Sequence, residues 1–351
     1  MSLALLRLRD FRAIRSAELV LHPRLNLITG ANGSGKTTVL EGIYLLGRGR
    51  SFRNRHTEHL IRHGERQLWL HGRTAPEPGH LIGIECHVDT GLKARIDERA
   101  ASSLAELSQA FPVQIIEPGI HRLVEDGPTQ RRRWVDWAVF HVEPQFVGSW
   151  QVYMRSLKQR NAALKAGGDP KLWEVELVRQ GNVLTSARRR VIAQLQSHWS
   201  SALADLDAVD ASMVFYQGWG QDRSLDEALA VQLPKDRERG TTSVGPHRFE
   251  ILLRVAGRSA REVVSRGQQK LLGAAMALSM ARYVAEVAGR ASTLLLDDPA
   301  AELDPAHTQR LLAAVASLGG QLVVTALRPE DTVLGRSDAV FHVEHGGVKR
   351  V

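Results

Sequence analysis

The sequence has a single cysteine, no long hydrophobic run and only a short apolar run at its start. Cys86 is the one cysteine among 351 residues, which excludes an intrachain disulfide and a zinc site built from several cysteines. The longest uncharged apolar run, from Leu271 to Ala281, is far shorter than the roughly 20 residues that cross a membrane. The apolar run at the amino terminus is too short for a signal peptide. From these absences we expect a cytoplasmic protein in a reducing compartment, with no membrane as a partner.

The charge balance of the chain is basic. Lysine and arginine number 46 against 38 aspartates and glutamates, which gives a formal net charge of +8 at pH 7. Hydrophobic residues make up 43% of the chain and charged residues 24%, as in an ordinary globular protein. A basic globular protein favours a polyanionic partner, either nucleic acid or an anionic membrane surface.

One glycine-rich stretch has the spacing of a phosphate-binding loop. It fits the pattern G-x-x-x-x-G-K-[ST] and lies between an apolar run typical of a strand, Leu25 to Thr29, and a segment typical of a buried helix. Its backbone N–H groups and the following helix N-terminus would face the phosphates of ATP. We expect Lys36 to reach the β- and γ-phosphates and the Thr37 hydroxyl to bind Mg²⁺. The loop consists of Gly30, Ala31, Asn32, Gly33, Ser34, Gly35, Lys36, Thr37 and Thr38.

A second motif supplies acids at the end of a strand. The apolar run Leu294 to Leu296 delivers Asp297 to the carboxyl edge of a parallel sheet, where nucleotides bind. We expect Asp297 to hold Mg²⁺, directly or through water, and Asp298 to orient the attacking water.

A third motif, Ser265, Arg266, Gly267 and Gln268, opens a predicted helix. A hydroxyl, glycine N–H groups and a helix N-terminus together make a second anion site. Taken alone, the segment is better explained as an ordinary serine helix cap. Together with the glycine loop, it suggests a nucleotide shared between two protomers.

The apolar pattern indicates an α/β fold in three segments. Residues 1–116 predict strands around the glycine loop, followed by an antiparallel meander. Residues 117–240 have helical spacing and predict a separate lobe, whose charged end at 234–240 is expected to be a loop. Residues 241–351 return to strands that complete the nucleotide-binding lobe.

In this order, the glycine loop, the Ser265 segment, the two acids and Glu302-Leu303-Asp304 resemble the ATPase head shared by ABC, SMC and Rad50 proteins. Further stretches resemble one family in that group, RecF, whose members are bacterial recombinational repair proteins. They cover residues 49–53, 123–128 with 131–136, 243–248 and 341–346. The resemblance extends over essentially the whole chain.

The resemblance implies an ABC-type ATPase head with a mixed sheet, an antiparallel meander and a helical lobe without a long coiled coil. It makes Asp297 the Walker B acid and the Ser265 segment the signature motif that meets the γ-phosphate of a partner. Asp298 stands where many ABC proteins have glutamate, and the shorter side chain suggests slow ATP turnover. Arg266 replaces the first signature glycine, and no switch histidine follows Thr325.

The resemblance also implies a function. It points to ATP-dependent dimerisation, binding to duplex DNA near single-strand gaps, and cooperation with RecR and RecO in loading RecA. A DNA-binding scaffold with a structural, hardly hydrolysed ATP is an alternative. A transporter ATPase subunit is remote, because the spacing from Lys36 to Asp297 leaves room for a larger helical lobe than such subunits carry.

Two arginine clusters are candidates for phosphate contacts with DNA. For any single arginine a solvated face is the simpler explanation, but with the net charge the clusters predict DNA binding with little sequence preference. The candidates are Arg50, Arg53, Arg55, Arg131, Arg132 and Arg133.

Overall fold

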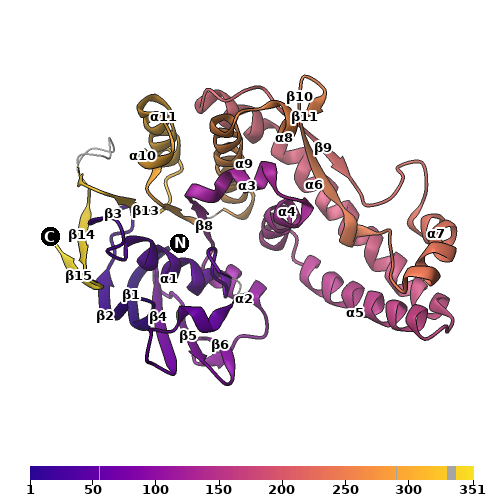
Figure 1. Ribbon diagram of the computed structural model, residues 1–351, viewed down its shortest axis with the longest axis horizontal. Coiled ribbons are helices and arrows are strands. Elements are labelled where there is room, and N and C mark those ends of the chain that lie inside the picture. Colours follow the sequence, from indigo (N-terminus) through magenta and orange to yellow (C-terminus); the bar gives the residue numbers. More distant parts are fainter. Residues whose placement is uncertain (55, 290, 330–336) are drawn as a thin grey trace. The chain divides into compact units, whose positions relative to one another are not determined.

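The computed structural model describes residues 1–351 except 55, 290 and 330–336 (Figure 1). The chain divides into two compact units. The first holds residues 1–121, 201–208 and 270–351, and the second holds residues 122–200 and 209–269.

The first unit contains two six-stranded sheets. One has the order β15-β14-β3-β13-β12-β8 and is parallel except for the β14–β15 hairpin. Its strands are β3 (Leu25–Thr29), β8 (Val113–Ile116), β12 (Thr293–Leu296), β13 (Leu322–Ala326), β14 (Ala339–Glu344) and β15 (Gly347–Arg350). The parallel strands are almost wholly buried, as expected for a sheet covered on both faces.

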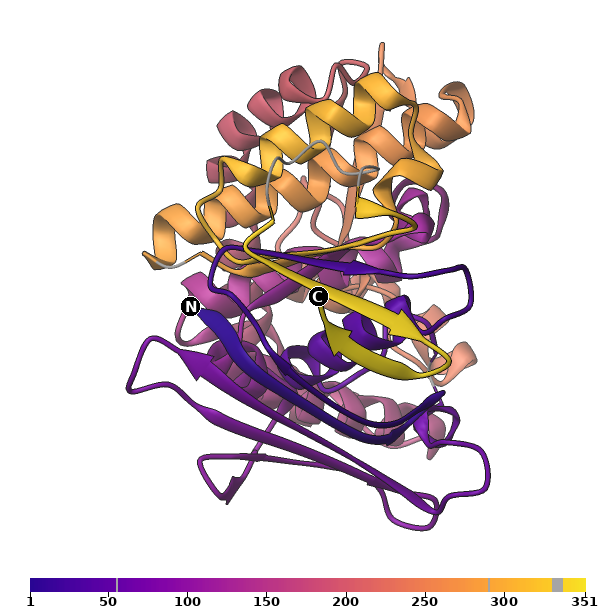
Figure 2. The ribbon, with the colours of Figure 1, turned by 90° about the vertical axis from the view of Figure 1, so that its left-hand side faces the viewer.

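The other sheet is antiparallel and follows the order β2-β1-β4-β5-β6-β7. Strands β4, β5 and β6 form the meander that the sequence predicted, and β1 and β2 extend it into one sheet. Its strands are β1 (Ser2–Phe11), β2 (Ile14–Val20), β4 (Gln67–Ala75), β5 (Leu81–His87), β6 (Gly91–Ile96) and β7 (Arg99–Ala100). Figure 2 shows the yellow β14–β15 hairpin beside the indigo amino-terminal strands.

Helix α1 (Lys36–Arg48) joins the two sheets into one core. Val39, Leu40 and Ile43 are fully buried in a cluster that includes residues from both sheets. The other helical segments of this unit are α2 (Leu104–Ala110), α10 (Pro299–Glu302) and α11 (Pro305–Ala316), with the 3-10 turns η1 (Thr57–Leu60) and η2 (Pro118–His121). The core therefore fixes the helix that begins with the glycine loop's lysine.

The second unit is mainly helical. Its helices are α3 (Arg122–Glu125), α4 (Pro128–Val142), α5 (Phe146–Lys165), most of α6 (Glu174–Asp205), α7 (Leu225–Arg239) and α8 (Ala260–Val263), with η3 (Pro170–Trp173) and η4 (Pro246–Arg248). A small sheet of β11 (Arg258–Ser259), β10 (Glu250–Val255) and β9 (Ser212–Tyr216) completes it. Helix α9 (Arg266–Ala288) begins in this unit and continues into the first.

The structure differs from the sequence prediction at two places in this unit. Residues 234–239 are not a loop but the end of α7, whose start is fixed by a Ser224–Glu227 capping box and whose end is fixed by Gly240 in the left-handed conformation. Residues 241–269 belong with the helices rather than with the nucleotide-binding lobe, because β10 pairs with β9.

Among the described residues, one helix is long and apolar enough to cross a membrane by length and composition. It is α9, and 72% of its most apolar window is buried inside the protein. The core helix of a globular protein meets the same criterion.

Buried ion pairs hold the second unit together. The fully buried Arg160 guanidinium donates to Asp236 at 2.9 Å, to Glu174 at 2.9 Å and to the Thr242 hydroxyl at 2.8 Å. Asp236 is itself fully buried and lies on α7. The Arg160–Asp236 pair therefore ties α5 to the end of α7, which the sequence predicted to be a loop.

Arg160→Ala is expected to destabilise the second unit by roughly 3–5 kcal/mol, because it leaves the Asp236 carboxylate buried without its cation. Urea unfolding followed by tryptophan fluorescence measures this, since six of the seven tryptophans lie in the second unit. Arg179→Ala is the matched control. It removes an exposed arginine that pairs with Glu176 one helical turn away, and should leave the midpoint nearly unchanged. Equal shifts of the urea midpoint in the two variants would contradict the stabilising role assigned to the buried Arg160–Asp236 pair.

Candidate nucleotide-binding site

The order of the parallel strands brings three functional segments to one edge. Strand β13 lies between β3 and β12 and pairs with both in parallel. The carboxyl ends of these strands lead into the glycine loop, Thr325 and Asp297. Residues more than 250 positions apart in the sequence therefore meet at the edge where α/β sheets bind ligands.

The glycine loop requires glycine at its first position. Gly30 has φ of 149°, and a Cβ there would lie 2.3 Å from the Val343 carbonyl oxygen of β14. The Gly346 N–H also donates to the Ser34 carbonyl at 3.3 Å. Val343 and Gly346 belong to the 341–346 stretch, so this stretch supports the loop directly.

Polar atoms of the loop fit a phosphate group. Lys36 is 6% exposed, and its ammonium group donates to the carbonyls of Gly30 at 2.7 Å and Ala31 at 3.1 Å. The Ser34 hydroxyl is buried and has no hydrogen-bond partner within the described part of the chain. A buried cation and an unsatisfied hydroxyl on a glycine-rich turn before a helix make a suitable anion site.

Asp297 lies between two threonine hydroxyls. Thr37 Oγ1 is 3.0 Å from each carboxylate oxygen, and Thr325 Oγ1 donates to Oδ1 at 2.8 Å. Asp297 is 8% exposed, and burial raises its pKa despite these hydrogen bonds and the charges of Arg53 and Lys36. A hydroxyl and a carboxylate oxygen in contact are a donor set suited to Mg²⁺.

Thr325 is a residue of this site that the sequence analysis did not assign. It is fully buried, and its hydroxyl contacts Asp297 while it accepts a hydrogen bond from the Asp298 N–H at 2.8 Å. Asp298 has φ of 46° and ψ of 56°, a left-handed conformation that is uncommon for a residue with a side chain. One hydroxyl thus positions both acids. A threonine at the end of a buried strand is the only sequence signal for this role.

Helix α1 is linked to the 49–53 stretch through a buried carboxylate. Glu41 is fully buried and accepts hydrogen bonds from the Arg12 guanidinium at 2.6 and 2.7 Å and from the Ser51 hydroxyl. Arg53 Nη1 lies 3.8 Å from the same carboxylate. This network fixes the segment that carries Arg53 beside the first turns of the phosphate-binding helix.

The Ser265 segment forms a helix cap at the surface. The Ser265 N–H donates to the Gln268 side chain at 3.1 Å, and the Gln268 N–H donates back to the Ser265 hydroxyl at 3.3 Å. Ser265, Arg266, Gly267 and Gln268 are all exposed. The second unit holds this segment, whereas the first unit holds the glycine loop.

The three arginines of α4 have different environments, because consecutive helical residues point about 100° apart. Arg131 is wrongly predicted as a DNA contact. It is 9% exposed and donates twice to Glu250 at 2.9 Å and once to the Leu123 carbonyl at 2.7 Å. Arg132 is half-buried and donates to the Phe249 carbonyl at 3.1 Å, and burial lowers its pKa. Arg133 is exposed.

The cluster of Arg50, Arg53 and Arg55 is only partly exposed for contact with DNA. The Arg53 side chain is 46% exposed, although it faces Glu41. Arg50 is half-buried. Desolvation of the buried Tyr44 would raise its pKa, but the positive charges of Arg48 and Arg50 lower it overall. Arg55 lies outside the described residues.

Asp297→Asn is expected to make the ligand-free protein more stable at neutral pH. The raised pKa means that the folded state binds the proton more tightly than the unfolded state. Below the ordinary aspartate pKa, Asp297 is protonated in both states and its charge does not destabilise the fold. The destabilisation develops as pH rises through the raised pKa of the folded state. Thermal midpoints measured from about pH 4 to pH 8 should separate the variant from the wild type only toward neutral pH.

Asp304→Asn is the control, because its effect on the dependence of stability on pH should have the opposite sign. Hydrogen bonds from the His307 backbone and side chain lower the pKa of this exposed carboxylate. The wild type should hold a small advantage at neutral pH and lose it as pH falls. An Asp297→Asn variant less stable than the wild type at neutral pH would contradict the description of the site.

Sequence comparisons place the chain among known proteins. The family model of the RecF/RecN/SMC N terminal domain matches residues 2–349. A DNA replication and repair protein RecF from Chromohalobacter salexigens is 37% identical over 356 residues, covering 99% of each chain. The protein of the same name from Pseudomonas aeruginosa is 36% identical over 361 residues, covering 100% of this chain and 98% of its own.

Comparison with solved structures confirms the predicted ABC/SMC-type ATPase head. A structure described as the recombination mediator protein RecF with ATP in the RecFOR pathway aligns with a TM-score of 0.89 at 23% identity, covering 100% of this chain and 97% of that one. An SMC head bound to the winged-helix domain of ScpA aligns with a TM-score of 0.59 at 17% identity, covering 100% and 98%. The family model and the full-length relatives show that this chain belongs to the RecF family of DNA replication and repair proteins.

Proposed function

We propose that this chain binds ATP and Mg²⁺ at the glycine loop, dimerises in that state, and binds DNA at single-strand gaps. RecO and RecR are the proposed partners, and loading of RecA is the proposed outcome. The observation that carries the proposal is the contact of Thr37 with Asp297 beside a loop that fits phosphate. The descriptions of the relatives, DNA replication and repair protein and mediator of the RecFOR pathway, support the biological setting. A cytoplasmic location follows from that setting.

The loop residues would bind and orient the nucleotide. Lys36 would exchange its two carbonyl acceptors for phosphate oxygens, and the Ser34 hydroxyl would gain the partner that it lacks among the described residues. Thr37 and Asp297 would hold Mg²⁺, which neutralises phosphate charge when bound. Thr325 would keep its hydrogen bond to Asp297 and so hold the carboxylate in place.

Hydrolysis would depend on Asp298. Its backbone is fixed by Thr325 and by the left-handed turn into α10. An aspartate reaches one methylene less far than the glutamate of many ABC proteins, so we propose weak, slow, DNA-stimulated turnover. In the alternative, a DNA-binding scaffold, ATP is bound and hardly hydrolysed. A phosphate-release assay with and without DNA distinguishes the two functions.

Dimerisation would follow from the distribution of the motifs. Each chain has one glycine loop, in the first unit, and one Ser265 segment, in the second. In a two-fold dimer each segment can meet the nucleotide of the partner. Ser265 and Gly267 are exposed at the surface, so the Ser265 hydroxyl and the N–H groups around Gly267 are suitable hydrogen-bond donors to a γ-phosphate. ADP lacks this phosphate, so only ATP should close the dimer.

Ser265→Arg is expected to bind ATP nearly as the wild type does and to fail to dimerise. Lys36 and Thr37 are unchanged in this variant, whereas a bulky cation fills the space that the partner's phosphate must enter. Light scattering with ATP and with ADP measures the dimer, and equilibrium ATP binding checks the loop. Ser224→Arg, at the cap of α7, is the matched control for the loss of a serine cap. A Ser265→Arg dimer with ATP, or a wild type indifferent to the γ-phosphate, would refute the proposal.

A further inference from the structure

The outward face of the antiparallel sheet carries a row of polar and aromatic residues with a gap in it. Buried residues of β1, β4 and β5 alternate with exposed ones, so that one face packs on the core and the other meets solvent. Cross-strand pairing aligns Arg7, His71, Gly83 and Arg95 in one row across four strands. Gly83 leaves that row without a side chain at its third position.

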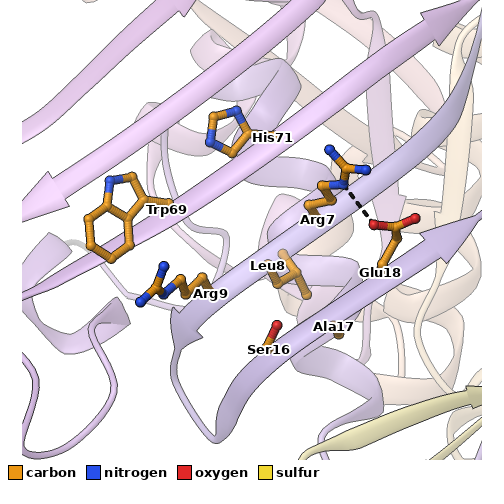
Figure 3. A pocket seen from close by; sticks show the side chains of 8 residues that line it. All are labelled: Arg7, Leu8, Arg9, Ser16, Ala17, Glu18, Trp69 and His71. Atoms are coloured by element: carbon orange, nitrogen blue, oxygen red, sulfur yellow. Dashed lines mark hydrogen bonds and ion pairs between the residues drawn. The ribbon is translucent and has the colours of Figure 1, made fainter.

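Two adjoining cavities open on this face. One has a volume of about 390 Å³ and the other about 910 Å³, and both are lined by Arg7 and His71. The larger cavity includes Gly83 and the side chains on either side of it in the row. Figure 3 shows the smaller one, with Trp69, His71 and the arginines standing on the strands. The face is thus hollowed where the glycine lies, which is a shape that a flexible ligand can enter.

The charge of the face favours an anionic ligand. Five cations, Arg7, Arg9, Arg73, Lys93 and Arg95, lie on the outward side against the carboxylates Glu18 and Glu85, and a third carboxylate, Glu98, lines the larger cavity. Arg7 is paired with Glu18 at 2.7 Å. In the described part of the chain, Arg73 and Arg95 are exposed and have no carboxylate partner. Both line the larger cavity, and they belong to β4 and β6, the strands on either side of the one that carries Gly83.

An aromatic ring adjoins the charged residues. Trp69 is half-buried and lies opposite Arg9 on the neighbouring strand. The Arg9 guanidinium lies 5.1 Å from the centre of the Trp69 ring. A stacked guanidinium and indole beside a basic hollow provide flat surfaces on which unpaired bases stack.

We propose that this face binds single-stranded nucleic acid, with phosphates at Arg73 and Arg95 and a base in the hollow above Gly83. Duplex DNA fits the same charges less well, because its bases are inside and its rigid backbone cannot enter a hollow between two strands. The proposal rests on the DNA-binding function proposed above and assigns the single-stranded part of a gapped substrate to this sheet. Binding of single-stranded nucleic acid to this face should not require ATP, because the face contains none of the nucleotide-site residues.

Gly83→Val tests the hollow without disturbing the fold. A Cβ at this position would meet the His71 ring at 3.7 Å, an ordinary contact, and the glycine does not have a positive φ. A β-branched side chain suits a strand. With a short fluorescent oligothymidylate and no nucleotide, anisotropy should show binding weakened roughly tenfold. Binding of ATP, and of a fully paired duplex with ATP, should be unchanged.

Arg95→Gln is the second variant, and Arg24→Gln is its charge control. Arg24 is exposed in the same unit and does not line the two cavities. Loss of Arg95 should lower the dependence of log affinity on log salt by about 0.7 for the oligothymidylate, whereas loss of Arg24 should leave it unchanged. This pair keeps the test decisive if Gly83→Val is poorly folded.

Three results would overturn the proposal. They are an oligothymidylate affinity equal in Gly83→Val and wild type, an equal loss in Arg95→Gln and Arg24→Gln, and competition by polyglutamate as strong as by the oligothymidylate. The last would mean that an acidic peptide is the ligand. Failure of the wild type to bind ATP or duplex DNA would instead refute the proposed function, so the two failures are distinguishable.

Discussion

The contact between Thr37 and Asp297 is the interaction on which the organisation of the first unit depends. It joins the first turn of α1 to the end of β12, at opposite ends of the sequence, across the intervening strand β13. The carboxylate is held at the cost of burial, which raises its pKa, and the hydroxyls of Thr37 and Thr325 offset only part of that cost. A protein built only for stability would place an apolar residue or an amide there. Retaining a desolvated acid beside a phosphate-binding loop is characteristic of a site that gains its cation with its ligand.

Arginine has two separate uses in this chain. Arg131, Arg160 and Arg188 are buried and bind carboxylates or carbonyls within the second unit. Their charges are balanced inside the fold and contribute little to an external partner. The arginines of the outward sheet face are exposed, and two of them, Arg73 and Arg95, have no carboxylate partner among the described residues. The net positive charge therefore indicates a nucleic-acid partner, but the position of an arginine in the sequence does not tell which of these uses it serves.

The parts of the fold that sequence reasoning predicted well are those set by local spacing. The strand Leu25–Thr29 has the predicted bounds, since the glycine loop that directly follows it marks its end. Thr325 was not assigned, because its role depends on the order of strands β3, β13 and β12, which pairs residues far apart. Arg131 was assigned wrongly for the same reason, since its partner Glu250 is 119 positions away. The charged residues at 234–240 suggested a loop, but the capping box at Ser224 and the buried Asp236 keep residues 234–239 helical.

The most direct test of the central claim is the dependence of ATP affinity on Mg²⁺ in the wild type and in Thr37→Val. If Thr37 and Asp297 hold the metal of bound ATP, Mg²⁺ should tighten ATP binding to the wild type and have little effect on Thr37→Val. Affinity without metal should be similar in the two proteins, because Lys36 and the other residues of the glycine loop are unchanged. An equal Mg²⁺ effect in both would show that the metal is held elsewhere and would contradict the assignment of the site.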